Sequence, residues 1–114
     1  MPRKGEIVLV PFPFTDLSTQ KLRPALVLAS GKNLGTNVVV ALISTNIKKP
    51  LPLYDVLLDQ NSSGFKQTGL KITSVIKLDR IATLNRGIFL GELGTINSPT
   101  QVEVAKRLKT LFDF

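Results

Sequence analysis

Two short apolar runs joined by a polar stretch constrain the fold of this chain more than any other feature. Residues 25–29 (ALVLA) and 38–43 (VVVALI) are branched aliphatic runs, and residues 31–36 (GKNLGT) between them are turn formers. This pattern predicts an antiparallel hairpin. If the turn is centred in the middle of the polar stretch, Arg23 lies opposite Ser44, because the residue numbers of each pair in a hairpin add up to the same total.

An Arg-Pro step opens the first of these runs. Pro24 restricts Arg23 to extended geometry, and as the first strand residue it removes no essential ladder hydrogen bond. The Arg23 side chain is therefore predicted to be presented at the strand start, next to the hydroxyl groups of Ser44 and Thr45. A register shift of one residue would exchange Ser44 with Thr45 and turn the hydroxyl to the other face, so both are candidates.

Further apolar runs predict a fold that is mostly β. Expected strands are Glu6–Phe12, Leu53–Leu58, Thr73–Leu78, Ile81–Leu84 and Gly87–Leu90. Short strands at close spacing favour a small barrel or a sandwich over alternating β/α units. With 114 residues and 43% hydrophobic residues, the chain suits a single domain over residues 1–114.

The chain closes with one predicted helix. Ser98 is the expected N-cap, Pro99 the first helical residue, and Gln101 the partner of Ser98 in a capping box. An apolar stripe on this helix is predicted to face the core. The stripe consists of Val102, Ala105, Leu108 and Leu111/Phe112.

Composition excludes several kinds of chemistry. The chain has no cysteine and no histidine, which removes disulfides, thiolate nucleophiles, histidine acid–base catalysis and the usual zinc sites. The acidic residues lack the paired spacing of a metal-dependent nuclease or a glycosidase, so neither a metal nor a cofactor is expected. Asp55 and Asp59 are expected to be solvated residues at strand edges.

Charge points to a polyanionic partner. The formal net charge is +7, which suits a nucleic acid and would suit an acidic protein equally well. The N-terminal apolar run is short and interrupted by prolines, so neither a signal peptide nor a membrane span is predicted, and a cytoplasmic location is expected.

Arg23 with Ser44 and Thr45 is the one constellation that could act on a phosphate. Arginine offers five fixed donors and a permanent charge. RNA can be cleaved without a metal if its 2′-hydroxyl is activated, the leaving oxygen is protonated and the phosphorane charge meets fixed donors. The alternative is structural: Arg23 pairs with Asp16 or Asp79, and the two hydroxyls are ordinary strand-end groups.

The order of these motifs resembles a known family. Residues 5–10 (GEIVLV), 23–28 (RPALVL), 43–46 (ISTN) and 73–81 (TSVIKLDRI), followed by the amphipathic helix, are similar to the successive motifs of the MazF/PemK toxins of bacterial type II toxin–antitoxin systems. The resemblance extends over nearly the whole chain. Two departures are the loop at residues 16–22 (DLSTQKL), without the family's glycine and glutamate, and a serine in place of the common threonine at position 44.

The resemblance implies an SH3-like barrel that forms a homodimer and acts as a metal-independent, sequence-specific endoribonuclease on single-stranded RNA. It implies that Arg23 and Ser44 are catalytic, with Thr45 as the alternative hydroxyl, and that the product carries a 2′,3′-cyclic phosphate. It also implies a cognate antitoxin with an acidic tail.

Aromatic rings for base stacking and a basic groove are expected around such a site. Substrate-binding candidates are Phe14, Gln20, Lys21, Lys48, Lys49, Phe65, Lys66 and Arg80. Phe65 is equally interpretable as a core residue. Two other functions stay open on the sequence alone: a DNA gyrase inhibitor of the related CcdB type, and a nucleic-acid-binding module without activity.

Overall fold

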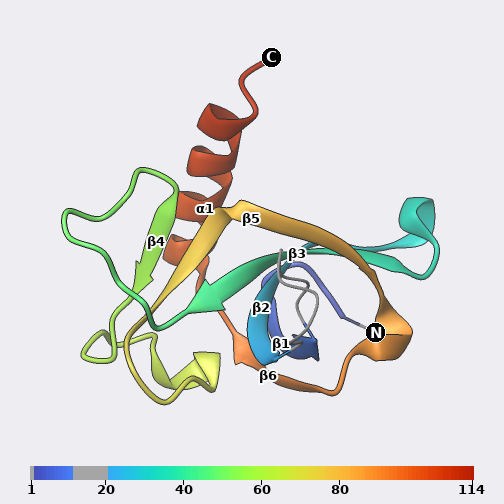
Figure 1. Cartoon of the computed structure of the whole chain (residues 1–114), viewed down its shortest axis with the longest axis horizontal. Helices are drawn as coiled ribbons and strands as arrows, with labels where there is room; N and C mark the ends of the chain where they lie inside the picture. Colours follow the sequence, from blue (N-terminus) through green and yellow to red (C-terminus); the bar gives the residue numbers. More distant parts are fainter. Residues whose placement is uncertain (1, 12–20) are drawn as a thin grey trace.

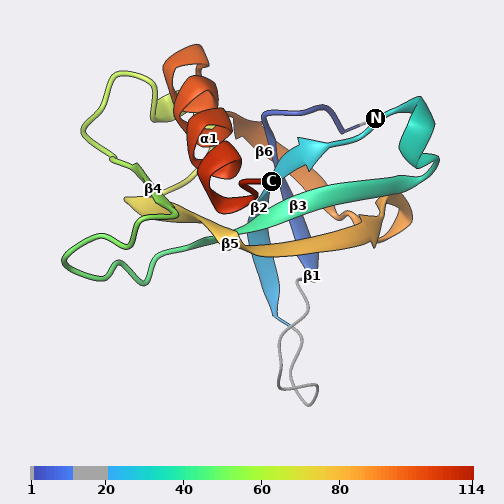
Figure 2. The same ribbon diagram turned by 90° about the horizontal axis from the view of Figure 1, so that it is seen from above.

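In the part of the chain that the structure describes, six antiparallel strands form one strongly curled sheet, and one C-terminal helix packs against it (Figures 1 and 2). This computed structural model describes residues 2–11 and 21–114. The strands are β1 (Glu6–Pro11), β2 (Leu22–Ala29), β3 (Asn37–Ser44), β4 (Asp55–Leu58), β5 (Ser74–Asn85) and β6 (Gly91–Thr95), in the sheet order β4-β5-β3-β2-β1-β6. The predicted fold, a small curled β-barrel with one C-terminal helix, is confirmed.

Among the described residues, the strands are connected by the 3-10 turns η1 (Lys32–Leu34), η2 (Lys66–Thr68) and η3 (Arg86–Ile88). The helix α1 spans Ser98–Leu111. Within the described ranges, no helix combines the length and the apolar character that crossing a membrane requires.

The hairpin between β2 and β3 has the predicted register. Ala25 pairs with Leu42 and Val27 pairs with Val40. The residue numbers of both pairs add up to the same total, as expected for a turn centred in residues 31–36. The register slips by one residue only near the turn, where Ala29 pairs with Val39 and η1 occupies the connection. A local pattern of apolar runs and turn formers was therefore sufficient to predict this pairing.

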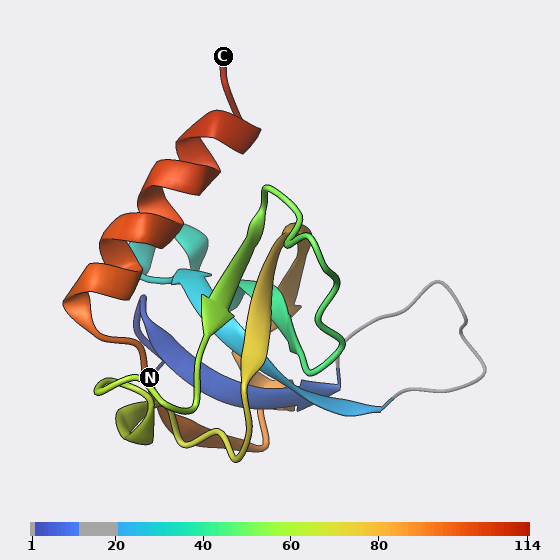
Figure 3. The same ribbon diagram turned by 90° about the vertical axis from the view of Figure 1, so that its left-hand side faces the viewer.

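Both faces of the curled sheet are buried, which explains why the runs in β2 and β3 are apolar at successive positions rather than alternating. One face carries a core that includes Leu26 and Ile43 and is closed by Val104 of α1. The opposite face carries a second core that includes Ala25 and Leu42. Figure 3 shows how the sheet curls, with β4 and β5 lying steeply across β1.

Three of the predicted strands differ from the structure. The segments predicted as Thr73–Leu78 and Ile81–Leu84 form one continuous strand, β5, because an irregularity in its pairing with β3 absorbs residues 78–80 between Lys77 and Ile81. No strand occupies Gly87–Leu90. There the side chain of Asn85 accepts a hydrogen bond from the Gly87 N–H and starts the turn η3, and β6 follows only at Gly91.

The predicted helix exists, but its cap and its buried face differ from the prediction. Asn97, not Ser98, is the N-cap, and its Oδ1 accepts a hydrogen bond from the Thr100 N–H at 3.0 Å. Val104 and Leu108 face the core, whereas Val102 is 68% exposed. The predicted stripe began on the wrong residue because the sequence periodicity fits two neighbouring faces of the helix.

Candidate functional site

Arg23 and Ser44 lie at the open end of the β2–β3 hairpin, each two residues beyond its last pair, Ala25 with Leu42. Arg23 pairs with Val10 of β1, and Ser44, the last residue of β3, pairs with Val75 of β5. If the pairing of Ala25 with Leu42 were continued by two residues, Arg23 would lie across from Ser44. Strand alternation directs both side chains to the face that carries the second core, and both residues are half-buried.

Thr45 takes a different place from Ser44. The Ser44 Oγ accepts a hydrogen bond from the Asn46 N–H at 3.0 Å, which holds the hydroxyl at the strand end. Thr45 lies just beyond β3 and, together with Pro24 and Ser74, lines a groove of about 450 Å³. Alternation along β2 puts Pro24 on the face opposite to Arg23. Of the two hydroxyls, Ser44 thus lies on the face to which strand alternation directs the Arg23 side chain.

A buried ion pair lies on the same face, one step along the sheet. Lys77 pairs with Leu42 on one side and with Asp55 on the other, and its Nζ lies 3.0 Å from the Asp55 Oδ2. The prediction that Asp55 is solvated was wrong, since it is 2% exposed. Sequence reasoning also missed Lys77. The available signal was a lysine inside the apolar stretch of residues 75–78, where a charge needs a partner.

Three of the predicted substrate-binding cations flank the Arg23–Ser44 pair along the chain. Lys21 is exposed immediately before β2, and Lys48 and Lys49 are exposed on the connection that follows Ser44. Lys66 and Arg80 are also exposed, but they lie on other elements, η2 and the irregular part of β5. Phe14 and Gln20 lie outside the described residues, as does Asp16.

Phe65 is a core residue. It is 8% exposed and belongs to the core cluster that also contains Leu58 and Ile96. Its carbonyl accepts a hydrogen bond of 2.6 Å from the hydroxyl of the buried Thr68, the last residue of η2. A ring packed in this way has no free face on which a base could stack, so its interpretation as a substrate-binding residue is corrected to the core alternative.

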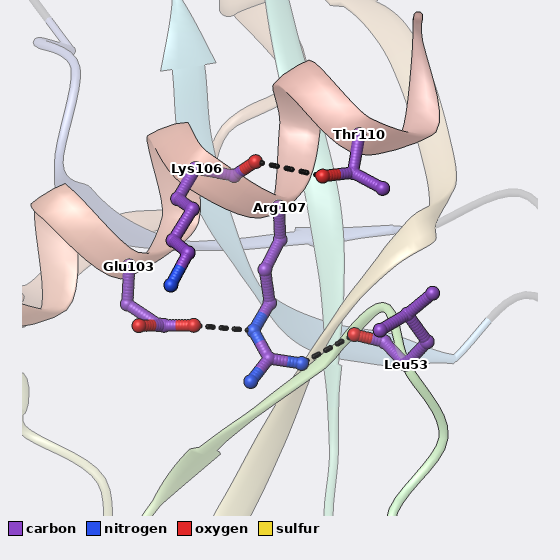
Figure 4. A network of polar contacts seen from close by, with 5 residues as sticks. All are labelled: Leu53, Glu103, Lys106, Arg107 and Thr110. Carbon is purple, nitrogen blue, oxygen red and sulfur yellow. Dashed lines mark hydrogen bonds and ion pairs between the residues drawn. The ribbon is translucent and has the colours of Figure 1, made fainter.

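Helix α1 is tied to the connection between β3 and β4 by one arginine (Figure 4). The Arg107 Nε donates to the Glu103 Oε2 at 2.6 Å, and its Nη1 donates to the backbone carbonyl of Leu53. The hydrogen bond from Arg107 holds the pKa of Glu103 below its usual range, with the charges of Arg107 and Lys106 acting in the same direction.

Two carboxyl groups face each other on the neighbouring strands β1 and β6. A hydrogen bond with Glu6, followed by repulsion from its charge, raises the pKa of Glu92. Arg3 opposes this shift. In the described part of the chain, acidic side chains form no group of three or more that could hold a metal ion.

Comparison with solved structures finds the same fold in several toxins. The "Mycobacterium tuberculosis toxin MazF-mt6" is 23% identical, with 96% of this chain and 97% of that chain covered at a TM-score of 0.73. MazF from Deinococcus radiodurans is 20% identical, with 99% and 97% covered at a TM-score of 0.74. An "Endoribonuclease in complex with its cognate antitoxin from Mycobacterial species" is 18% identical, with 100% and 97% covered at a TM-score of 0.73.

A comparison with curated proteins gives no match. The family model described as "PemK-like, MazF-like toxin of type II toxin-antitoxin system" matches residues 3–112, which includes all six strands and the whole of helix α1. The resemblance suggested by the sequence motifs is thereby confirmed, and the chain belongs to the PemK/MazF-like toxins of type II toxin–antitoxin systems.

Proposed function

We propose that this toxin is a metal-independent endoribonuclease that cleaves single-stranded RNA at specific sequences. The observation that supports the proposal is the hairpin register: the pairing of Ala25 with Leu42, continued by two residues, would set Arg23 beside Ser44 on one face in a chain of this family. A guanidinium and a hydroxyl together provide donors of fixed direction and a permanent positive charge, which phosphate chemistry requires in the absence of a histidine.

The proposed reaction is attack of the ribose 2′-hydroxyl on the adjacent phosphorus. The 2′-oxygen forms a bond to phosphorus as the bond from phosphorus to the 5′-oxygen breaks, so the product is a 2′,3′-cyclic phosphate and a new 5′-hydroxyl. The proton lost from the 2′-oxygen is balanced by the proton that the 5′-oxygen gains. Arg23 neutralises the charge that accumulates on the phosphate oxygens, and the Ser44 hydroxyl donates to one of them.

The proposed partners follow from the same charge and family. Lys21, Lys48 and Lys49 would contact the RNA backbone near the reacting phosphate. A net charge of +7 supports neutralisation by an acidic antitoxin, and a solved structure of similar fold is described as an endoribonuclease in complex with its cognate antitoxin. We also propose that the toxin acts as a homodimer, in which a two-fold axis would bring identical surfaces together.

The test is cleavage of a long unstructured RNA in EDTA, with the cut ends mapped. The wild type should give discrete cuts, and Arg23→Ala should lower the rate by about 100-fold or more, as expected when a charge-stabilising donor is removed. Ser44→Ala should lower the rate more than Thr45→Ala does. Lys32→Ala, which removes an exposed charge from the hairpin turn, is the matched control and should cleave normally.

Two results would overturn parts of the proposal. If the purified wild-type protein leaves RNA intact in EDTA, and its expression in cells still arrests their growth, the ribonuclease proposal is wrong. Gyrase inhibition then becomes the next function to test. If Thr45→Ala is the more damaging hydroxyl substitution, Thr45 rather than Ser44 holds the phosphate.

A further inference from the structure

The connection between β3 and β4, residues 45–54, is a basic surface segment that starts immediately after Ser44. It carries Lys48 and Lys49, both exposed, and it ends at Leu53, which is 62% exposed, and at the half-buried Tyr54. No residue of it belongs to a strand or a helix. Such a segment would lose conformational entropy on binding a substrate unless the protein already holds it in place.

Hydrogen bonds in the described structure hold the segment near its two ends. At the start, the Asn46 N–H donates to the Ser44 Oγ at 3.0 Å. At the end, the Leu78 N–H of β5 donates to the Tyr54 carbonyl at 2.9 Å, and the guanidinium of Arg107 donates to the Leu53 carbonyl. The contact from Arg107 ties the segment to helix α1, an element otherwise remote from it in sequence.

The guanidinium is itself held in position for this contact. Its Nε donates to the Glu103 Oε2 at 2.6 Å, one helical turn earlier, while its Nη1 reaches the Leu53 carbonyl (Figure 4). Two donors on one rigid plane can serve two acceptors in different directions. A lysine ammonium at the same place is a single point charge without that planar fork, so it reproduces the arrangement poorly.

We propose that Arg107 is a positioning residue for RNA binding: by holding the Leu53 carbonyl, it fixes residues 45–54 so that Lys48 and Lys49 meet the phosphates next to the one held by Arg23 and Ser44. The inference rests on the proposed ribonuclease function. Arg107 acts through the segment and does not touch the RNA. Helix α1 thereby contributes to substrate affinity as well as to the core.

The first test is the affinity for a 2′-O-methyl RNA, which cannot be cleaved, measured by fluorescence anisotropy. Arg107→Ala should weaken binding about 3- to 10-fold, the scale expected for ordering a few side chains on binding. Arg107→Lys should restore only part of the affinity. Lys109→Ala is the matched control, since it removes one exposed positive charge from the same helix and should change affinity less than twofold. With cleavable RNA, Arg107→Ala should raise KM and leave kcat almost unchanged.

A double-mutant cycle separates positioning from a general effect on charge or folding. In a protein that already carries Lys48→Ala and Lys49→Ala, the further change Arg107→Ala should have almost no effect on RNA affinity, because the cations that it positions are gone. Additive losses would show that Arg107 acts independently of this segment and would overturn the inference.

A third measurement needs no RNA. Trypsin cleaves after Lys48 only if the segment can open, so Arg107→Ala should be cut there faster than the wild type, whereas Lys109→Ala should not. If Arg107→Ala fails to fold, Glu103→Gln loosens the same guanidinium and should show the same changes to a smaller extent. Faster proteolysis with unchanged RNA affinity would overturn the inference alone, and a wild type that neither binds nor cuts RNA would overturn the proposed function with it.

Discussion

The buried ion pair between Asp55 and Lys77 is the single-residue feature on which stability should depend most sharply. The two side chains are 3% and 15% exposed, and their charged atoms lie 3.0 Å apart. Removing one partner of a buried pair leaves the other charge without compensation, so Lys77→Met should lower the free energy of unfolding by about 3 kcal/mol. The measurement is urea denaturation followed by circular dichroism.

The double variant Lys77→Met with Asp55→Leu is the control for this prediction. It removes both charges, and its stability should recover most of the loss, because a buried ion pair and an apolar pair of similar volume are often nearly equivalent. If the single and double variants are equally unstable, the loss comes from packing and not from the uncompensated charge.

The carboxyl pair Glu6–Glu92 predicts a pH dependence of the opposite sign to that of an ordinary ion pair. The pKa of Glu92 is raised in the folded state, so its favourable contribution is present at acid pH, where Glu92 is protonated, and is lost as the pH rises through that pKa. Glu92→Gln should therefore raise Tm at pH 7, with the gain shrinking toward about pH 4. A gain of equal size at both pH values would contradict this reading, and Asp113→Asn, at an exposed position past the end of α1, is the control.

At the scale of the element, the start of α1 depends on a single amide side chain. Asn97 accepts the hydrogen bond from Thr100, and Ser98 is already inside the helix. Asn97→Ala should therefore cost about 1 kcal/mol of stability, the typical value for loss of an N-cap, and Ser98→Ala should cost much less. Thermal unfolding of the two variants distinguishes them, and a larger loss for Ser98→Ala would restore the cap that the sequence predicted.

The elements that the sequence predicted correctly are those whose pairing is local. Both the presence of the β2–β3 hairpin and its register were predicted, because two apolar runs and one turn determine them. The fusion of two expected strands into β5 was not predictable in this way, because the irregularity that joins them forms against β3, far away in the sequence. The same holds for the N-cap, because the capping pattern in the sequence did not separate Asn97 from Ser98.

At the scale of the whole molecule, the hairpin register was predictable from the sequence, but the surroundings of the candidate pair were not. Arg23 and Ser44 lie in one hairpin, and their proximity stays a prediction from its register. Phe65 and Asp55 are buried against segments that lie tens of residues away in the sequence. The contact from Arg107 to the Leu53 carbonyl also joins segments separated by tens of residues. Neither composition nor periodicity encodes such contacts, which arise only when the curled sheet and α1 come together.

The net charge of +7 indicates that RNA binding by the whole molecule should depend on salt concentration. If Arg23, Lys21, Lys48 and Lys49 neutralise four phosphates of a single strand, the logarithm of the binding constant should fall with the logarithm of salt concentration at a slope of about −3. Lys48→Ala with Lys49→Ala should make the slope shallower by about 1.4, because two counterions fewer are released. The measurement is a salt titration with 2′-O-methyl RNA.

Lys32→Ala with Lys109→Ala is the matched control for this titration. It also removes two exposed positive charges, but from the hairpin turn and from helix α1, neither of which adjoins Arg23 or Ser44 in the sequence. Its slope should equal that of the wild type, because only cations that contact phosphates release counterions. Equal slopes for both double variants and the wild type would mean that the basic connection after Ser44 does not contact the RNA.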